Sequence, residues 1–386
     1  PKRSVSEDAF KIHGYSDKFL SDKKTFSEIS ENFLNFIKNK KIIIHNATFD
    51  LSFLNYELRR IKQKEIDKNN VIDTLEIARQ KYPGSQNSLD ALCKRFNINN
   101  AKKVADSFGG SVALSSEEAI SNPNVDIVYI CSATPTHTEY ILSAAKAEKG
   151  IFCEKPIATT LADADRMIET VEQNGVAMTI NHSRRWRPIF RPVLDELNKG
   201  SIGQLQRIVC SFGGPRAMLF RNGTHMVDTM CMFADSEPQW VFAELEEGYE
   251  DYWPYQGDGG RTPELEPAVS GYIHFKNGVR AFYNNSKRMF GRRDWELFGT
   301  TGCITVSDQH AFIETENVGK KIDCPHNTYV DSPAAIRELI GVMEKSGETC
   351  SPPSQGRRVL EVLLAFMASQ RKGNSRIDLP LDENAV

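Results

Sequence analysis

The sequence predicts an α/β protein in which an incomplete, doubly wound parallel sheet is followed by an α+β domain with a mostly antiparallel sheet. Between residues 125 and 182, short apolar strands alternate with helical stretches of about 10 to 15 residues. After about residue 185 the strands become longer and alternate in polarity. The composition, 40% hydrophobic and 26% charged with a mean hydropathy of -0.43, excludes a wholly disordered chain.

The first hundred residues read as helix, strand, helix, helix, with a further helix before residue 100. Apolar residues at helical spacing predict a helix over 25–40, and the run KIIIH predicts a buried strand over 41–45. Helices are then expected over 45–62, 71–82 and 88–96, the last of them after the breaker Pro83-Gly84.

The middle of the chain carries the regular alternation of a Rossmann-like domain. Helices are expected over 101–108, 116–123, 136–149 and 161–175, and strands over 125–133, 150–155 and 176–182. Beyond it, strands are expected over 204–214, 239–247, 268–286 and 294–308, and helices over 221–233 and 331–346.

Several function classes are disfavoured by composition. No stretch approaches the roughly 18 apolar residues of a membrane span, and the start has no apolar core of a leader, so we expect a cytoplasmic protein without membrane partners. The eight cysteines form no CxxC pair, which argues against a disulfide framework or a zinc site.

The charge balance changes abruptly along the chain. Residues 1–100 contain 18 basic and 13 acidic residues, a net charge of +5, whereas residues 101–386 contain 30 and 38, a net charge of -8. Only two of the 25 glycines precede residue 101. One fold requires no such break, so two segments of different origin are indicated.

Two motifs carry residues suited to chemistry. The run GIFCEKP places Glu154 and Lys155 at the carboxyl end of a predicted strand, where open α/β sheets bind ligands, although a surface lysine is an equal alternative. His225 and Asp228 lie one turn apart on a predicted helix, a spacing that also suits a structural contact.

Together these segments resemble the glucose-fructose oxidoreductase/inositol dehydrogenase (Gfo/Idh/MocA) family. The matching runs are VDIVYICSATPTHTEYILSAAKAEKGIFCEKPIATTLADADRMI, NHSRRWRP at 181–188, THMVD at 224–228 and ELFGTTGCITV at 296–306. The resemblance implies hydride transfer between NAD or NADP and a sugar, polyol or related C–OH substrate. Such a reaction needs groups that take the hydroxyl proton and steady the developing oxyanion.

The same resemblance implies the site residues. Lys155 and His225 match the catalytic lysine and histidine. The implied cofactor-binding residues are Thr134, Pro135, His137, Glu154, Lys155 and Asn181, and the implied substrate-binding residues are Arg184, Asn222, Thr224 and Asp228.

The sequence departs from that family in two ways. Arg221 stands where family members often have an aspartate, four residues before the histidine. The glycine-rich strand–GxGxxG–helix unit that cradles the pyrophosphate is missing. KIIIH and the helix that follows it could occupy the position of the missing strand and helix beside VDIVYI. The turn between them, HNATFD, would then be the phosphate loop, and it contains no glycine. We therefore expect weakened NAD(P) binding.

Residues 1–100 resemble a fragment of the proofreading exonuclease (DnaQ-like) epsilon subunit of DNA polymerase III, which implies a ribonuclease H-like exonuclease fold. The matching runs are KIHGYSDKFL, KTFSEISENFLNFI, IIIHNATFDLSFLNYEL and VIDTLEIARQKYPGSQNSLDALCKRFNIN. Only Asp50 of HNATFD supplies one of the four metal-binding carboxylates that the resemblance implies; His45 and Asp73 fill no missing place. One carboxylate cannot organise a two-metal site, so neither bound metal nor nuclease activity is expected.

We therefore interpret the chain as an exonuclease fragment (1–100), a partial Rossmann NAD(P)-binding domain (101–185) and an α+β substrate and oligomerisation domain (186–386). Three functions stay open: an oxidoreductase by descent, an exonuclease fragment, and an inactive chimera joined near Asn100 and Ala101. The expected partners are a small sugar or polyol-like substrate, no specific nucleic acid, and a second copy paired through the C-terminal sheet.

Overall fold

The computed structural model describes residues 23–38, 40–44, 46–81, 105, 109–252, 254–257, 265–291, 293–317, 319–324 and 330–382. The chain divides into two compact units, Pro1–Val112 and Ala113–Val386, and each is described by itself. The helix expected over 88–96 and nearly all of that over 101–108 lie outside the described residues. No helix in the described ranges is long and apolar enough to cross a membrane.

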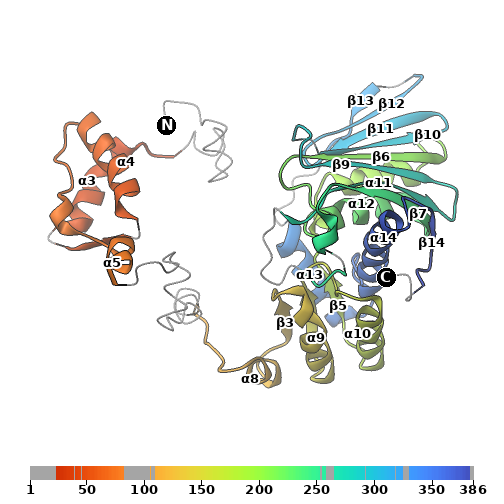
Figure 1. The fold of residues 1–386 in the computed structure, drawn as a ribbon, viewed down its shortest axis with the longest axis horizontal. Coiled ribbons are helices and arrows are strands. Elements are labelled where there is room, and N and C mark those ends of the chain that lie inside the picture. The colour runs from red at the N-terminus through yellow and green to blue at the C-terminus, as the bar shows by residue number, and fades with distance from the viewer. Residues whose placement is uncertain are drawn as a thin grey trace. The chain divides into compact units, whose positions relative to one another are not determined.

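The N-terminal unit is a small α/β assembly (Figure 1). Its elements are α3 (Phe26–Ile37), β1 (Ile42–Ile44), α4 (Ala47–Arg60), the 3-10 turn η1 (Lys68–Asn70), β2 (Val71–Asp73) and α5 (Thr74–Lys81). A capping box starts α3, in which the backbone N–H of Thr25 donates to the Glu28 carboxylate at 2.7 Å. The core is formed by Leu51, Leu58 and Ile66, against which α3 packs.

The helix expected over 71–82 is wrong in its first three residues. Val71, Ile72 and Asp73 form β2, which pairs in parallel with β1. The Asp73 carboxylate then accepts the backbone N–H of Leu75 at 2.9 Å and so begins α5. Strand pairing with β1 overrides the helical periodicity of this run, because two β-branched residues fit a strand better than a helix.

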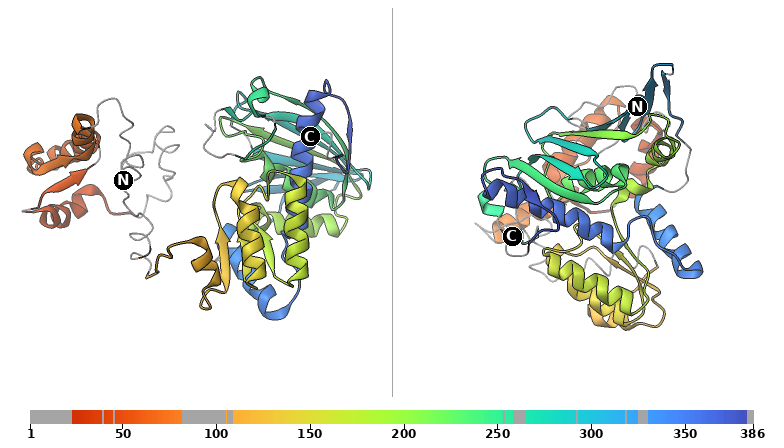
Figure 2. Two further views of the ribbon diagram at one scale, coloured as in Figure 1. Left: turned by 60° about the horizontal axis from the view of Figure 1, so that its bottom comes forward. Right: turned by 90° about the vertical axis from the view of Figure 1, so that its right-hand side faces the viewer.

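The second unit begins with α8 (Ser116–Ser121) and a three-stranded parallel sheet. Its strands are β3 (Ile127–Ile130), β4 (Gly150–Cys153) and β5 (Met178–Ile180), joined by α9 (His137–Lys146) and α10 (Leu161–Gln173). The side chains of β4 alternate. Ile151 and Cys153 join the core that includes α9 and α10, whereas Phe152 packs against α13 (Asp331–Lys345). Helices therefore cover both faces of this sheet (Figure 2).

Within the described residues, β1 does not take the place of the missing first strand beside β3. β1 pairs only with β2, in a separate two-stranded sheet, and β3 pairs only with β4. In the described ranges the strand KIIIH is thus paired with β2.

The larger sheet of the second unit has nine strands and is mostly antiparallel, as expected. Its order is β13-β12-β11-β10-β6-β9-β8-β7-β14, and only β6 and β9 pair in parallel. The strands are β6 (Leu205–Gly213), β7 (Pro238–Leu245), β8 (Val269–Phe275), β9 (Arg280–Ser286), β10 (Arg293–Gly299), β11 (Gly302–Ser307), β12 (Ala311–Thr315), β13 (Gly319–Lys321) and β14 (Ile377–Asp378).

One face of this sheet is covered by helices. These are α11 (Phe190–Asn198), α12 (Gly223–Ala234) and α14 (Pro353–Arg371). The long α14 was not anticipated from the sequence. It contacts β7, α12, α10 and β5, and is buried along most of its length. Because α14 contacts both sheets, a single hydrophobic core runs from the parallel sheet into the larger one.

Candidate active site

The carboxyl end of β4 brings two predicted residues close together. Lys155 follows β4 by two residues, and its Nζ donates to the backbone carbonyl of Arg221 at 3.0 Å. Arg221 lies two residues before α12, and His225 lies in the first turn of that helix. The fold therefore joins segments that are about seventy residues apart in the sequence at the edge where parallel sheets bind ligands.

His225 has the properties of a neutral base. Its Nδ1 atom is buried and has no hydrogen-bond partner among the described residues. Burial, followed by the nearby positive charges of Arg184 and Lys155, lowers the pKa of His225 well below the ordinary value of 6.5. At neutral pH the imidazole is thus uncharged.

A buried network lies beneath His225. The guanidinium of Arg185 donates to both carboxylate oxygens of Asp228, with Nη2 to Oδ1 at 2.7 Å and Nε to Oδ2 at 2.9 Å. The Nδ1 atom of His182 lies 3.6 Å from Oδ1 of Asp228, and its Nε2 is 3.2 Å from the Thr224 hydroxyl. Burial lowers the pKa of His182 to about 4, although Asp228 opposes this effect.

This network changes how two predicted substrate-binding residues are interpreted. Asp228 and Thr224 are 0% and 1% exposed, so their side chains hold internal partners and do not face solvent. His182 and Arg185 were missed as network members, although both stand in the quoted run NHSRRWRP. The helical spacing of Asp228 from His225 did not reveal that an arginine from another segment would pair with it.

The other predicted substrate-binding residues also have protein partners. Arg184 is 5% exposed and its Nε lies 3.4 Å from Asp308, which Arg187 and Arg293 also approach. Burial lowers the pKa of Arg184 to about 10. Burial alone would raise the pKa of Asp308, but the three guanidinium charges lower it overall. Asn222 donates through Nδ2 to the Arg216 carbonyl at 2.8 Å, immediately before α12.

The predicted cofactor-side residues form a second cluster around Glu154. Its Oε1 atom accepts the Asn181 amide at 2.7 Å and the Tyr129 hydroxyl at 2.9 Å. Asn181 also donates to the hydroxyl of Ser332 at 3.0 Å, next to the start of α13. Glu154 and Asn181 therefore tie the carboxyl ends of adjacent strands together, and Tyr129 leaves 41% of its surface exposed beside them.

The loop after β3 is held from two sides. The ring of His137 is buried, with Nδ1 3.1 Å from the Pro156 carbonyl and Nε2 3.1 Å from that of Ser132. On the other side, a Cβ added to Gly257 would lie 2.7 Å from Cδ of Pro135 and 3.3 Å from Thr134. His137 thus links two loops, whereas Pro135 is exposed at the surface.

The pyrophosphate of a dinucleotide cofactor needs a particular kind of loop at the strand ends of the parallel sheet. In the described structure, the loops that directly follow β3, β4 and β5 contain no glycine. A pyrophosphate cradle needs backbone N–H groups that side chains do not screen, at the start of a helix. Among the described residues, these strand ends thus offer no glycine-rich cradle for a pyrophosphate.

Asp50 is the one predicted nuclease carboxylate in the N-terminal unit. Asp50 is exposed in the first turn of α4, and no group of three or more His, Cys, Asp or Glu in the described ranges is arranged to hold a metal ion. His45 lies outside the described residues. Asp73 instead caps two helices, since its carboxylate also accepts the N–H of Asn46 at 3.0 Å and of Ala47 at 2.8 Å.

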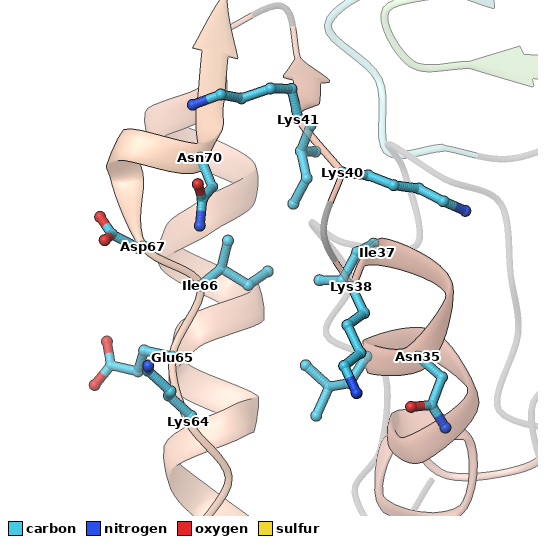
Figure 3. A pocket seen from close by; sticks show the side chains of 12 residues that line it. Asn35, Ile37, Lys38, Lys40, Lys41, Lys64, Glu65, Ile66, Asp67 and Asn70 are labelled. Carbon is cyan, nitrogen blue, oxygen red and sulfur yellow. The ribbon is translucent and has the colours of Figure 1, made fainter.

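A cavity of about 570 Å³ lies within this same N-terminal unit. Its walls come from the end of α3 with the residues that follow it, and from the stretch 64–70 (Figure 3). Four lysines line it, but one of them, Lys41, already donates to the Asn69 carbonyl at 2.8 Å. Glu65 and Asp67 lie on the same wall and offset the positive charge, so the cavity has no single sign.

Two families match the chain by sequence. Residues 72–182 match the oxidoreductase family with an NAD-binding Rossmann fold, and residues 190–305 match the Gfo/Idh/MocA C-terminal domain. Residues 1–103 match the exonuclease family.

The curated relatives of the first segment are epsilon subunits of DNA polymerase III. That of Buchnera aphidicola (subspecies Schizaphis graminum) is 50% identical over 107 residues, which are 27% of this chain and 46% of the relative. That of Escherichia coli is 45% identical over 108 residues, which are 27% of this chain and 44% of the relative. The chain thus spans less than half the length of these relatives.

The similar solved structures show the fold of the oxidoreductase part. A probable dehydrogenase from Thermotoga maritima aligns with a TM-score of 0.59 and 23% identity, covering 75% of this chain and 90% of that one. An aldose-aldose oxidoreductase from Caulobacter crescentus, complexed with glycerol, aligns with a TM-score of 0.61 and 16% identity, covering 88% and 98%. Over more than half of its length the chain therefore belongs to the Gfo/Idh/MocA oxidoreductase family, and an exonuclease-family segment is joined in front of it.

Proposed function

We propose that this chain is an oxidoreductase by descent that acts on the C–OH group of a sugar, polyol or related small molecule, with strongly weakened NAD or NADP binding. The proposal rests on one contact. The Lys155 Nζ donates to the carbonyl of Arg221, just before the helix α12 that carries the uncharged His225. The family membership supports the reaction class. The named activity of the Caulobacter crescentus relative supports the substrate class.

The chemistry expected of this pair concerns the hydroxyl proton. Oxidation of an alcohol requires that the hydroxyl lose its proton as the carbonyl forms. His225 is held neutral and can accept that proton, while the Lys155 ammonium steadies the developing negative charge on oxygen. Lys155→Ala is expected to abolish turnover and leave the fold intact, whereas the matched control Lys199→Ala, at the exposed end of α11, should keep wild-type turnover.

We infer weakened cofactor binding from the loops that follow β3, β4 and β5, which contain no glycine. Without a glycine-rich turn, the pyrophosphate loses several charge-assisted hydrogen bonds, each worth about 1.5 to 3 kcal/mol. Two lost bonds would weaken binding by about 100-fold or more, since each 1.4 kcal/mol is about tenfold. The choice between NAD and NADP is left open, because the segment that would carry it is the missing one.

A fluorescence titration of the folded full chain with NADH and NADPH tests the proposal. Reduced nicotinamide mononucleotide, which has no pyrophosphate, is the matched ligand. We expect NADH and NADPH to bind no more than about threefold more tightly than the mononucleotide, because the chain does not hold the extra phosphate. Micromolar binding of NADH together with much weaker binding of the mononucleotide would show that a pyrophosphate site exists and would refute the weakened-binding proposal.

We also propose that two copies pair through the uncovered face of the nine-stranded sheet. Trp240 and Tyr272 stack there with ring centroids 4.9 Å apart, and Phe242 and Phe282 next to them are 42% and 39% exposed. An aromatic sheet face of this kind suits a second copy of the same face. Phe282→Glu should convert a dimer into monomers in sedimentation, whereas Phe290→Glu outside the strands should not.

The exonuclease alternative receives no support from the described geometry of Asp50. Magnesium- or manganese-dependent release of nucleotides from single-stranded DNA is not expected. Release that disappears with Asp50→Ala would overturn this expectation.

A further inference from the structure

A buried carboxylate lies behind the contact between Lys155 and Arg221. Glu266, just before β8, is 1% exposed. Its Oε1 atom accepts the backbone N–H groups of Phe220 and Arg221, the latter at 2.9 Å, and its Oε2 accepts Nε of Arg221 at 3.1 Å. One side chain therefore holds two successive peptide N–H groups and a guanidinium.

The held segment contacts one candidate acid/base group, Lys155, and leads into the helix that carries the other, His225. The carbonyl of Arg221 accepts the Lys155 ammonium, and the turn continues into α12, where Gly223 N–H donates to the Met218 carbonyl at 2.7 Å. Space is limited there, because a Cβ added to Gly223 would lie 3.0 Å from that carbonyl oxygen. A shift of residues 220–221 would thus move the Lys155 acceptor and the start of the helix that carries His225.

The burial of Glu266 indicates that its position is firmly determined. A buried carboxylate is costly unless charged or N–H donors surround it, and a half-satisfied one is strongly unfavourable. Here Arg221, the residue that departs from the family pattern, supplies the charge and one of the N–H donors. Arg221, which departs from the family pattern, is therefore paired with Glu266 from a distant segment. The sequence pattern did not reveal this pairing.

We propose that Glu266 is a positioning residue for the candidate active site, acting through the backbone of Arg221 on Lys155. The proposal rests on the proposed function in that Lys155 is taken as the reacting group. The proposed effect of Glu266 passes through the backbone of Arg221, and it concerns where and how firmly the Lys155 ammonium is held.

The test compares the full-length wild type with Glu266→Gln. Glu361→Gln is the matched control, because Glu361 is also a buried carboxylate, 8% exposed, that accepts a backbone N–H from Leu381 at 3.0 Å and pairs with Arg357 at 3.2 Å. Acetic anhydride labelling followed by mass spectrometry measures the rate of acetylation of Lys155 relative to exposed Lys199. This measurement needs no cofactor and no turnover.

In Glu266→Gln the guanidinium of Arg221 loses the negative charge of Glu266, and an amide NH2 that cannot accept a hydrogen bond replaces one of the two carboxylate oxygens. The Lys155 amine should then be labelled about tenfold faster, since that is the factor expected from one lost charge-assisted hydrogen bond. Glu361→Gln should label at the wild-type rate. An unchanged Lys155 rate in folded Glu266→Gln, or an equal change in Glu361→Gln, would overturn the positioning role.

Two further measurements separate this proposal from the proposed function. Where the wild type turns over, Glu266→Gln should lower kcat with little change in KM, because a positioning loss acts on the transition state. A wild type without turnover whose Lys155 labelling still responds to Glu266→Gln would refute the oxidoreductase activity and leave the positioning role standing. If Glu266→Gln does not fold, Glu266→Asp keeps the charge, retracts the carboxylate and should accelerate labelling to a smaller extent; an unchanged rate there would also overturn the proposal.

Discussion

The pH dependence of stability follows from the burial of His182. The ring is 1% exposed, and burial lowers its pKa from 6.5 to about 4 in the folded protein. Between these two values the unfolded chain binds more protons than the folded one, so the free energy of unfolding decreases as the pH falls. The stabilisation is present above about pH 6.5 and is progressively lost toward pH 4.

The magnitude can be worked from the same two pKa values. Linkage gives a loss of about 2 kcal/mol between pH 7 and pH 5 from His182 alone, and about 3 kcal/mol over the whole window. His225 has a pKa shifted in the same direction, so the wild type should lose more than this. The difference between wild type and His182→Gln isolates the contribution of His182.

Urea unfolding followed by tryptophan fluorescence measures this effect. All four tryptophans, Trp186, Trp240, Trp253 and Trp295, belong to the second unit, so their fluorescence does not report on the first. The pH 7 to pH 5 loss should be about 2 kcal/mol smaller in His182→Gln than in the wild type. An equal pH dependence in wild type and His182→Gln would refute the reasoning.

Two stability predictions accompany this one and use the same unfolding assay. Asp228→Asn should cost about 3 to 5 kcal/mol because it leaves a buried guanidinium without its countercharge, whereas Asp378→Asn in an exposed ion pair should change stability by less than about 1 kcal/mol. Equal small losses would mean that the buried pair contributes nothing specific. Gly257→Ala should destabilise more than Gly278→Ala, since both glycines have positive φ, +77° and +88°, but only Gly257 has Pro135 against its missing Cβ; equal losses would refute the contact.

The periodicity of the sequence was sufficient to predict most local structure. The strands β3, β4 and β5 and the helices α9 and α10 form where apolar alternation and helical spacing place them, because local patterning and burial agree in this part of the chain. The helix expected at Val71 failed because its strand partner lies nearly thirty residues away. The long α14 was missed, since a helix that is buried on nearly all sides shows little amphipathic contrast.

The candidate site was predicted only in part. Lys155 and His225 could be chosen from motifs, because each stands in a short run with a distinct pattern of residues. Their partners could not. Glu266, Arg185 and His182 act through contacts between segments far apart in the sequence, and neither charge nor spacing within one segment indicates such pairing.

What the sequence by itself determined is therefore the local elements, the two family segments and the residue types available for chemistry. Within the described residues, the tertiary structure decided which strands pair and that the predicted substrate residue Asp228 is buried with an arginine. The physical reason is that strand pairing and charge burial are settled by long-range contacts, whose free energy depends on which segments meet and how far each group is removed from water.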